Sequence, residues 1–235
     1  MQLFFNSNID QDTQQITFDK IESKHIIRVL RKKEGDPIYI TDGKGLLFHC
    51  QIISANDKKC IVSILSQEKK EASKDYYLHI AIAPTKNMSR LEWFLEKATE
   101  IGIDEITPII CQNSERKIVK LERLEKIILS AVKQSLKFHI PKINRPIAFD
   151  QFLEEDKIGK VCIAHCGIGE KKLLKSIVSP KEQVTILIGP EGDFSTNEIE
   201  KSLKANCIPI TLGKTRLRTE TAALVAVQNI LFINQ

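Results

Sequence analysis

Strand-like and helix-like segments alternate regularly after residue 76, and this alternation constrains the fold more than any other feature of the sequence. Runs rich in Ile and Val predict strands at residues 77–83, 105–110, 161–165, 184–189 and 208–212. Between and after them, apolar residues at helical spacing predict helices over residues 89–101, 119–136, 196–205 and 221–232. Alternation of this kind predicts an α/β layer sandwich with a mainly parallel sheet.

Start and stop signals mark two of these helices. Ser89 and Glu92 have the spacing of a capping box, and so do Ser195 and Glu198. Gly102 is the residue type that commonly follows the last turn of a helix.

The first seventy residues are predicted to be rich in strands and to form a separate domain. Strand runs occupy residues 37–41, 46–53 and 59–65, with turn sequences at 42–45 and 56–59, and a short helix is predicted near residues 23–30. This pattern predicts a small barrel or meander. Residues 67–75 are highly charged and lack apolar periodicity, so they are the best linker candidate. We therefore expect domains at residues 1–70 and 76–235.

Composition sets broad limits on function. The 35 Lys and Arg against 30 Asp and Glu give a net charge of +5, which is mild support for a polyanionic partner. The N-terminus lacks a secretory pattern, so we expect a cytoplasmic protein. No ligand spacing predicts a metal site. The six cysteines form no CxxC pair and are predicted to be small buried residues without disulfides: Cys50, Cys60, Cys111, Cys162, Cys166 and Cys207.

Two polar loops each follow a predicted strand and precede a predicted helix. One covers residues 189–195, and the other, with the start of the helix, residues 213–223. Ligands of parallel sheets bind at the carboxyl ends of strands, so both loops are predicted to line one small-molecule site. Arg216, Arg218 and Glu220 are costly to bury unless they are paired or exposed. A turn leading into a capped helix stays the alternative for the first loop, and an Arg218–Glu220 ion pair for the second.

Common nucleotide-binding motifs do not fit these glycines. A phosphate loop ending in Gly213 and Lys214 would need an upstream glycine where Ile208 stands. His165 follows a predicted strand end, where it either lines the ligand site or has a structural role. The last predicted helix is apolar around most of its circumference, which favours burial in the core and in a subunit interface.

Several separated segments match one known family in the same order. They are residues 25–31 with Gly35 and Asp36, Lys86, residues 96–102, Gln134 and Ser135 with Pro141, residues 188–192 and residues 217–222. Together they resemble the bacterial 16S ribosomal RNA uracil-N3 methyltransferase family, of the SPOUT, or α/β-knot, class. The match covers nearly the whole chain.

The resemblance implies a fold, a cofactor and an assembly. The expected fold is α/β, with a small N-terminal PUA-like RNA-binding β-barrel and a C-terminal SPOUT domain containing a deep trefoil knot. The resemblance also implies S-adenosylmethionine as cofactor and a homodimer through the knot domain. The cofactor-binding residues that it implies are Ile188, Gly189, Pro190, Glu191, Gly192, Leu212, Gly213, Leu217, Arg218, Thr219, Thr221 and Ala222.

The implied activity is methylation of N3 of a specific uridine in 16S rRNA of the small ribosomal subunit. Arg218 is predicted to hold the uracil and stabilise the N3 anion, with Glu220 either orienting Arg218 or acting as the base. Predicted RNA contacts are His25, Arg28, Arg31, Lys32, Lys86, Arg116 and Lys137. A non-catalytic RNA-binding or ribosome-assembly factor and a methyltransferase for another RNA site stay as alternatives.

Two positions depart from the family pattern. Asp193 stands where a second glycine is common, and Lys137 stands where an arginine is common. A lysine keeps the positive charge but lacks the bidentate fork with which arginine contacts a phosphate.

Overall fold

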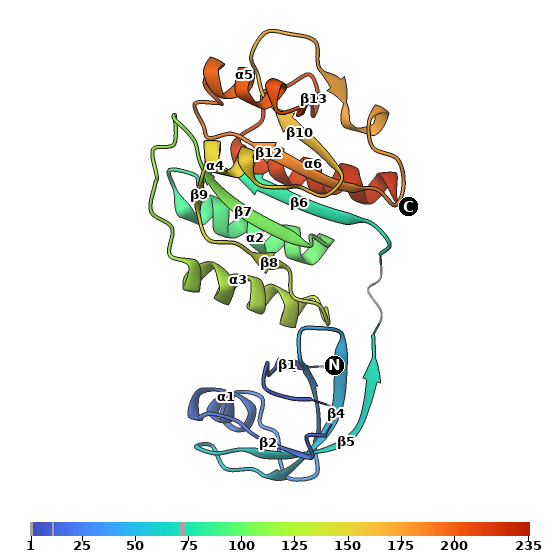
Figure 1. Ribbon diagram of the computed structural model, residues 1–235. Coiled ribbons are helices and arrows are strands. Elements are labelled where there is room, and N and C mark those ends of the chain that lie inside the picture. The colour runs from blue at the N-terminus through green and yellow to red at the C-terminus, as the bar shows by residue number, and fades with distance from the viewer. Residues whose placement is uncertain (1, 11, 71–73) are drawn as a thin grey trace. The chain divides into compact units, whose positions relative to one another are not determined.

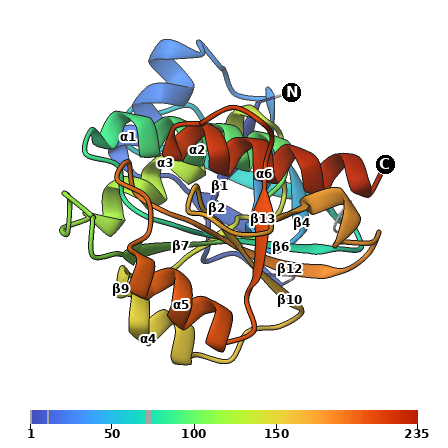
Figure 2. The same cartoon turned by 90° about the horizontal axis from the view of Figure 1, so that it is seen from above.

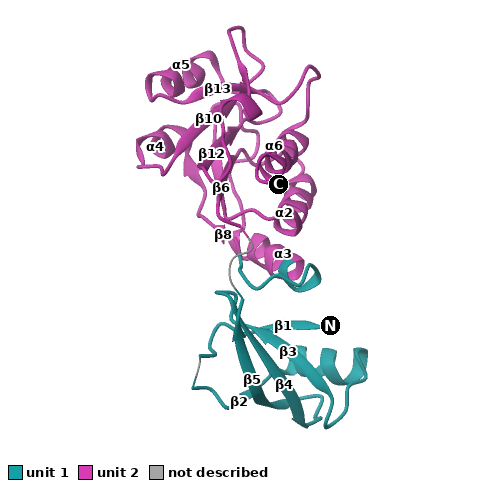
Figure 3. Cartoon of the chain, turned by 90° about the vertical axis from the view of Figure 1, so that its right-hand side faces the viewer, with its two compact units in different colours: residues 1–73, 132–140 teal, residues 74–131, 141–235 magenta. Residues whose placement is uncertain are grey.

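The computed structural model describes residues 2–10, 12–70 and 74–235. The chain forms two compact units, which Figure 3 shows in different colours. Unit 1 comprises Met1–Ser73 and Val132–Ile140, and unit 2 comprises Lys74–Ala131 and Pro141–Gln235. The predicted linker, residues 67–75, begins inside a strand, and its residues 71–73 lie outside the described part of the chain.

Residues 132–140 belong to unit 1, although they were predicted to lie in the second domain. They return to the turn at residues 42–45. Gly45 N donates to the Phe138 carbonyl at 2.9 Å, and Ile140 N donates to the Gly43 carbonyl at 2.9 Å. These long-range backbone bonds place the segment with the turn, and local sequence patterns do not reveal them.

Unit 1 is built on a five-stranded sheet of order β1-β3-β4-β5-β2 (Figure 1). Its elements are β1 (Leu3–Phe5), β2 (Gln15–Thr17), α1 (Lys20–Lys24), a π-helical turn (His25–Val29), β3 (Pro37–Thr41), β4 (Leu46–Ser54) and β5 (Ile61–Lys69). The three predicted strands and both turns are confirmed. Within the described residues the edge strands β1 and β2 do not pair with each other, so the sheet is open rather than a closed barrel.

Unit 2 contains the predicted parallel sheet, with the strand order β11-β13-β10-β12-β6-β7-β8 and β9 paired to β7. Its strands are β6 (Tyr77–Ile82), β7 (Glu105–Ile110), β8 (Lys142–Ile143), β9 (Ile147–Ala148), β10 (Lys160–Ala164), β11 (Lys172–Leu173), β12 (Gln183–Ile188) and β13 (Ile208–Thr211). The five long strands match the predicted ones. The two-residue strands β8, β9 and β11 are too short to give a periodic signal.

Helices cover both faces of this sheet. They are α2 (Met88–Ile101), α3 (Leu121–Gln134), α4 (Phe149–Glu154), α5 (Thr196–Lys204) and α6 (Thr219–Ile233), with a 3-10 turn at Leu174–Ser176. Figure 2 shows α2 and α6 on one side of the sheet and α4 and α5 on the other. Within the described residues, no helix is long and apolar enough to cross a membrane.

The helix starts agree with the predictions only in part. The capping box at Ser195 is present, with Glu198 as its second member. The one predicted at Ser89 is wrong, because α2 begins at Met88 and the Asn87 side chain caps it by accepting from Ser89 N. Helix α6 begins at Thr219, two residues before the predicted start, so Glu220 lies in its first turn.

Helix α6 buries one face against α2, β6 and β12. Ala223, Ala226 and Ile230 on that face are fully buried, whereas Phe232 is 63% exposed. Burial within one chain therefore covers only part of its apolar circumference. The homodimer and the knot expected from the resemblance stay predictions.

Candidate functional site

A cavity of about 580 Å³ lies where β10, β12 and β13 end. The two polar loops line it together, as their positions after parallel strands predicted. The predicted cofactor residues that line it are Ile188, Gly189, Pro190, Glu191, Leu212, Gly213, Leu217, Arg218, Thr219 and Ala222. Gly192 and Thr221 lie outside its lining.

Contacts with neighbouring segments hold the loop after β12 in place. Glu191 Oε1 accepts from Lys86 N at 2.9 Å, so this oxygen fastens the loop to the segment after β6. A Cβ on Gly189 would approach the Phe194 ring to 3.0 Å, closer than ordinary contact. Gly189 therefore lets the chain pack tightly where the strand becomes the loop.

The loop after β13 is joined to the first loop at the start of α6. Thr219 is buried, and its hydroxyl donates to the Gly189 carbonyl at 3.0 Å. Gly213 has φ +145, a conformation that favours glycine, and a Cβ there would meet only open space. The Thr219–Gly189 hydrogen bond makes the two motifs parts of one structural site.

The cationic side chains of this loop are unpaired. Lys214, Arg216 and Arg218 are exposed, and across residues 2–10, 12–70 and 74–235 their side chains make no hydrogen bond or ion pair. Three unpaired cations at the rim of one cavity favour an electron-rich or anionic ligand.

Glu220 pairs with a different arginine from the one predicted. The carboxylate is 7% exposed, and its Oε1 lies 3.8 Å from Arg90 Nε of α2. Its Oε2 is buried without a hydrogen-bond partner in the described part of the chain. Glu220 lies in the first turn of α6, the helix that packs against α2. The expected orientation of Arg218 by Glu220 is not what the structure shows.

The cavity also contains His165, which the sequence left as either a lining or a structural residue, and three residues that the sequence did not assign to the site. His165, Cys166 and Lys171 follow β10, and Asp193 belongs to the loop after β12. The rule that located the two loops, the carboxyl end of a parallel strand, applies equally to β10. Burial lowers the pKa of His165 below its usual range, and its Nδ1 is buried without a partner among the described residues. Cys166 is exposed, so its predicted burial is wrong; the other five cysteines are buried.

Four of the predicted RNA contacts lie on unit 1 around the π-helical turn. Arg28 is exposed and pairs with Asp57 at 2.8 Å, and His25 is 3.8 Å from Glu22. Arg31 is exposed with φ +55, and Lys32 reaches the Pro37 carbonyl at 3.4 Å. The charge of Arg28 is thus partly neutralised within the unit.

The other three predicted RNA contacts are divided between the units. Lys86 is exposed and pairs with Glu115 at 2.8 Å, and its carbonyl accepts from Arg116. Both belong to unit 2, beside the loop that contains Glu191. Lys137, predicted on the large domain, belongs to unit 1, and burial lowers its pKa.

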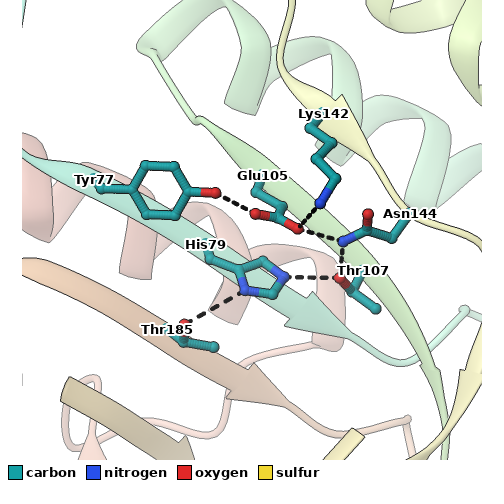
Figure 4. Close-up of polar contacts among 7 residues, drawn as sticks. All are labelled: Tyr77, His79, Glu105, Thr107, Lys142, Asn144 and Thr185. Carbon is teal, nitrogen blue, oxygen red and sulfur yellow. Dashed lines mark hydrogen bonds and ion pairs between the residues drawn. The ribbon is translucent and has the colours of Figure 1, made fainter. Parts of the chain in front are cut away.

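A second group of polar residues lies on the same sheet but near the amino ends of β6 and β7 (Figure 4). We call Tyr77, His79, Glu105, Thr107, Lys142, Asn144 and Thr185 the amino-end cluster. It lines a cavity of about 520 Å³. Glu105 accepts from Tyr77, Lys142 and Asn144, and His79 Nε2 lies 2.8 Å from Thr107 Oγ1. Burial opposes ionisation of Glu105, but these hydrogen bonds outweigh it and hold its pKa at about 2.

Family models match both parts of the chain. The model of an RNA methyltransferase domain matches residues 72–231, and that of an RNA methyltransferase PUA domain matches residues 18–65. The first covers more than half of the sequence.

Relatives and solved structures match over nearly the full length. Ribosomal RNA small subunit methyltransferase E of Buchnera aphidicola is 30% identical over 226 residues, covering 93% of this chain and 88% of the relative. A probable rRNA methyltransferase of Porphyromonas gingivalis superposes with a TM-score of 0.93 at 41% identity, over 100% of this chain and 98% of the other. The ribosomal RNA small subunit methyltransferase E of Neisseria gonorrhoeae, solved bound to S-adenosyl methionine, superposes with a TM-score of 0.85 at 26% identity. The superposition covers 100% of this chain and 98% of the other.

Proposed function

The chain belongs to the ribosomal RNA small subunit methyltransferase E family, and on that basis we propose that it transfers a methyl group from S-adenosylmethionine to N3 of a uridine in 16S rRNA. One observation carries the proposal: both family motifs line one cavity and are joined by the Thr219–Gly189 hydrogen bond.

The residues of the cavity fit the proposed cofactor. Its volume of about 580 Å³ is that of a typical small-molecule site. Ile188, Leu212 and Leu217 provide apolar walls for a nucleoside, and the backbone groups of the glycine loops provide hydrogen-bonding partners. When bound, S-adenosylmethionine supplies an electrophilic methyl group.

Side chains of this protein would align the uracil and stabilise the negative charge that develops at N3. Alignment of the ring nitrogen with the methyl carbon can lower the barrier by roughly 7–11 kcal/mol. N3 must also lose its proton, and the unpaired guanidinium of Arg218 would stabilise the anion that forms. Glu220 is the proposed base; its carboxylate is buried beside Arg90 of α2 and does not line the cavity, so it has to turn toward the uracil to accept the proton.

Positive charges on both units would hold the rRNA. We propose that the predicted RNA contacts bind its phosphates. They lie around His25, Arg28 and Lys32 on unit 1 and around Lys86 and Arg116 on unit 2. Phosphate contacts make affinity depend steeply on salt. We also propose a homodimer that covers the exposed part of α6 near Phe232.

The test is methyl transfer to small ribosomal subunits with labelled S-adenosylmethionine, followed by mass spectrometry of a nucleoside digest, which identifies the modified base, and of a ribonuclease digest to oligonucleotides, which locates it. We expect label in N3-methyluridine at one position of 16S rRNA. Label in another nucleoside would replace the proposed substrate atom. Cofactor binding without transfer to subunits or naked rRNA would favour the non-catalytic alternative.

A further inference from the structure

Asp193 holds a backbone conformation that disfavours most side chains. Its φ is +64, in the left-handed region, where glycine is the usual residue and aspartate is one of the better-tolerated alternatives. It lies in the loop after β12, and its side chain lines the cavity. The free-energy cost of this backbone conformation is offset when the side chain makes hydrogen bonds that glycine could not make.

The Asp193 carboxylate binds two backbone amides. Oδ2 accepts from Cys166 N at 2.7 Å, and Oδ1 accepts from Phe194 N at 2.9 Å. The Cys166 bond joins the loop after β10 to the loop after β12. The Asn113 side chain, from the loop after β7, donates to the Gly192 and Asp193 carbonyls at 3.3 and 3.1 Å. Three strand-end loops therefore meet at Asp193.

The loop after β10 needs such an anchor because it is exposed beyond Cys166. Ile168 is fully exposed, and a Cβ on Gly169 would contact nothing within 4 Å. His165 precedes the anchored amide and lines the cavity, and its Nδ1 is buried without a partner among the described residues. Fixing Cys166 therefore also fixes the wall that His165 forms.

We propose that Asp193 is a positioning residue for the cofactor site: its carboxylate holds the loop after β10 against the loop after β12, so that the cavity is formed before the ligand enters. This inference rests on the proposed function, because the ligand is taken to be S-adenosylmethionine. A preformed site avoids the entropy of ordering a loop on binding, so the tether is expected to strengthen affinity.

Asp193→Gly, Asp193→Asn and the control Asn206→Gly test this proposal. Glycine at 193 keeps the left-handed backbone but removes both acceptors, whereas asparagine keeps one oxygen. Asn206 has φ +60 and does not line the cavity, so Asn206→Gly relieves the same kind of backbone strain elsewhere in unit 2.

Calorimetry should show that Asp193→Gly weakens S-adenosylmethionine binding about tenfold, Asp193→Asn less, and Asn206→Gly not at all. The KM for the cofactor should rise in Asp193→Gly while kcat at saturation stays near wild type, which a loss of folded protein would not produce. Without cofactor, the Cys166 amide should exchange hydrogen faster in Asp193→Gly. An unchanged affinity or an unchanged Cys166 exchange rate would overturn the proposal. Failure of the wild type to bind the cofactor would instead overturn the proposed function, while the exchange comparison still decides whether the tether exists.

Discussion

Two polar regions lie on the sheet of unit 2, and they differ in how their polar groups are satisfied. In the amino-end cluster, hydrogen bonds run from Lys142 through Glu105, Asn144 and Thr107 to His79 (Figure 4). In the cavity at the carboxyl ends, by contrast, the Arg218 side chain and the His165 Nδ1 have no partner in the described chain. Buried polar groups that satisfy one another stabilise a fold, whereas groups held open by loops are available to a ligand.

Replacement of Arg218 should have the largest effect of the changes proposed here: a loss of activity without a loss of stability, which distinguishes the carboxyl-end cavity from the amino-end cluster. We expect Arg218→Ala to lower kcat for rRNA methylation about 10²–10³-fold, because one fixed donor to a developing anion commonly contributes that much. The melting temperature should stay near wild type, since the side chain is exposed and unpaired within the described residues. Steady-state kinetics and thermal unfolding measure both. Turnover within a factor of a few of wild type would remove Arg218 from the mechanism.

His79 should show its effect in stability and not in catalysis. Burial lowers its pKa from 6.5 to about 4, so the folded state favours the neutral ring. The unfolded chain takes up this proton near pH 6.5 and the folded chain only near pH 4. Stability should therefore fall by on the order of 3 kcal/mol as pH drops through this window.

Urea unfolding of the wild type and His79→Gln between pH 7 and pH 4 tests this claim. Glutamine has an amide that can still bond to Thr107 but does not titrate, so this part of the pH dependence should vanish. Methylation at neutral pH should be retained by the folded variant. Identical pH profiles for the two proteins would contradict the assignment.

Thr219→Val probes the hydrogen bond that joins the loop after β12 to the start of α6. Loss of the buried hydroxyl that donates to the Gly189 carbonyl should cost about 1–3 kcal/mol of unfolding free energy, because an acceptor is left unpaired. Cofactor affinity should weaken as well, which distinguishes this change from His79→Gln. Calorimetric binding that stays at the wild-type value would show that the bond is structural only.

Lys142→Met should have the smallest effect. Its ammonium is 2.9 Å from Glu105 Oε1, but the side chain is 67% exposed. Exposed ion pairs contribute about 0–1 kcal/mol, so denaturant unfolding should change little. A loss of several kcal/mol would show that the amino-end cluster depends on this cation more than its exposure allows.

The sequence predicted the loops better than the contacts between distant segments. The two loops were assigned to one site because each follows a strand run in the sequence, and the family resemblance then implied Gly189 and Leu217 as cofactor residues. His79, Thr107 and Thr185 lie inside strand runs, and only the strand register brings them together. The Arg90–Glu220 pair depends on how α2 packs against α6. Residues 132–140 join unit 1 through backbone bonds to residues nearly a hundred positions away.

Hydrogen–deuterium exchange with and without S-adenosylmethionine tests the central claim most directly, because it reports both polar regions in one experiment. Slower exchange is expected in peptides covering residues 164–171, 188–193 and 211–219, with no change over residues 142–158. Unchanged exchange in the first three segments at saturating cofactor, or protection confined to residues 142–158, would contradict the assignment of the carboxyl-end cavity as the cofactor site.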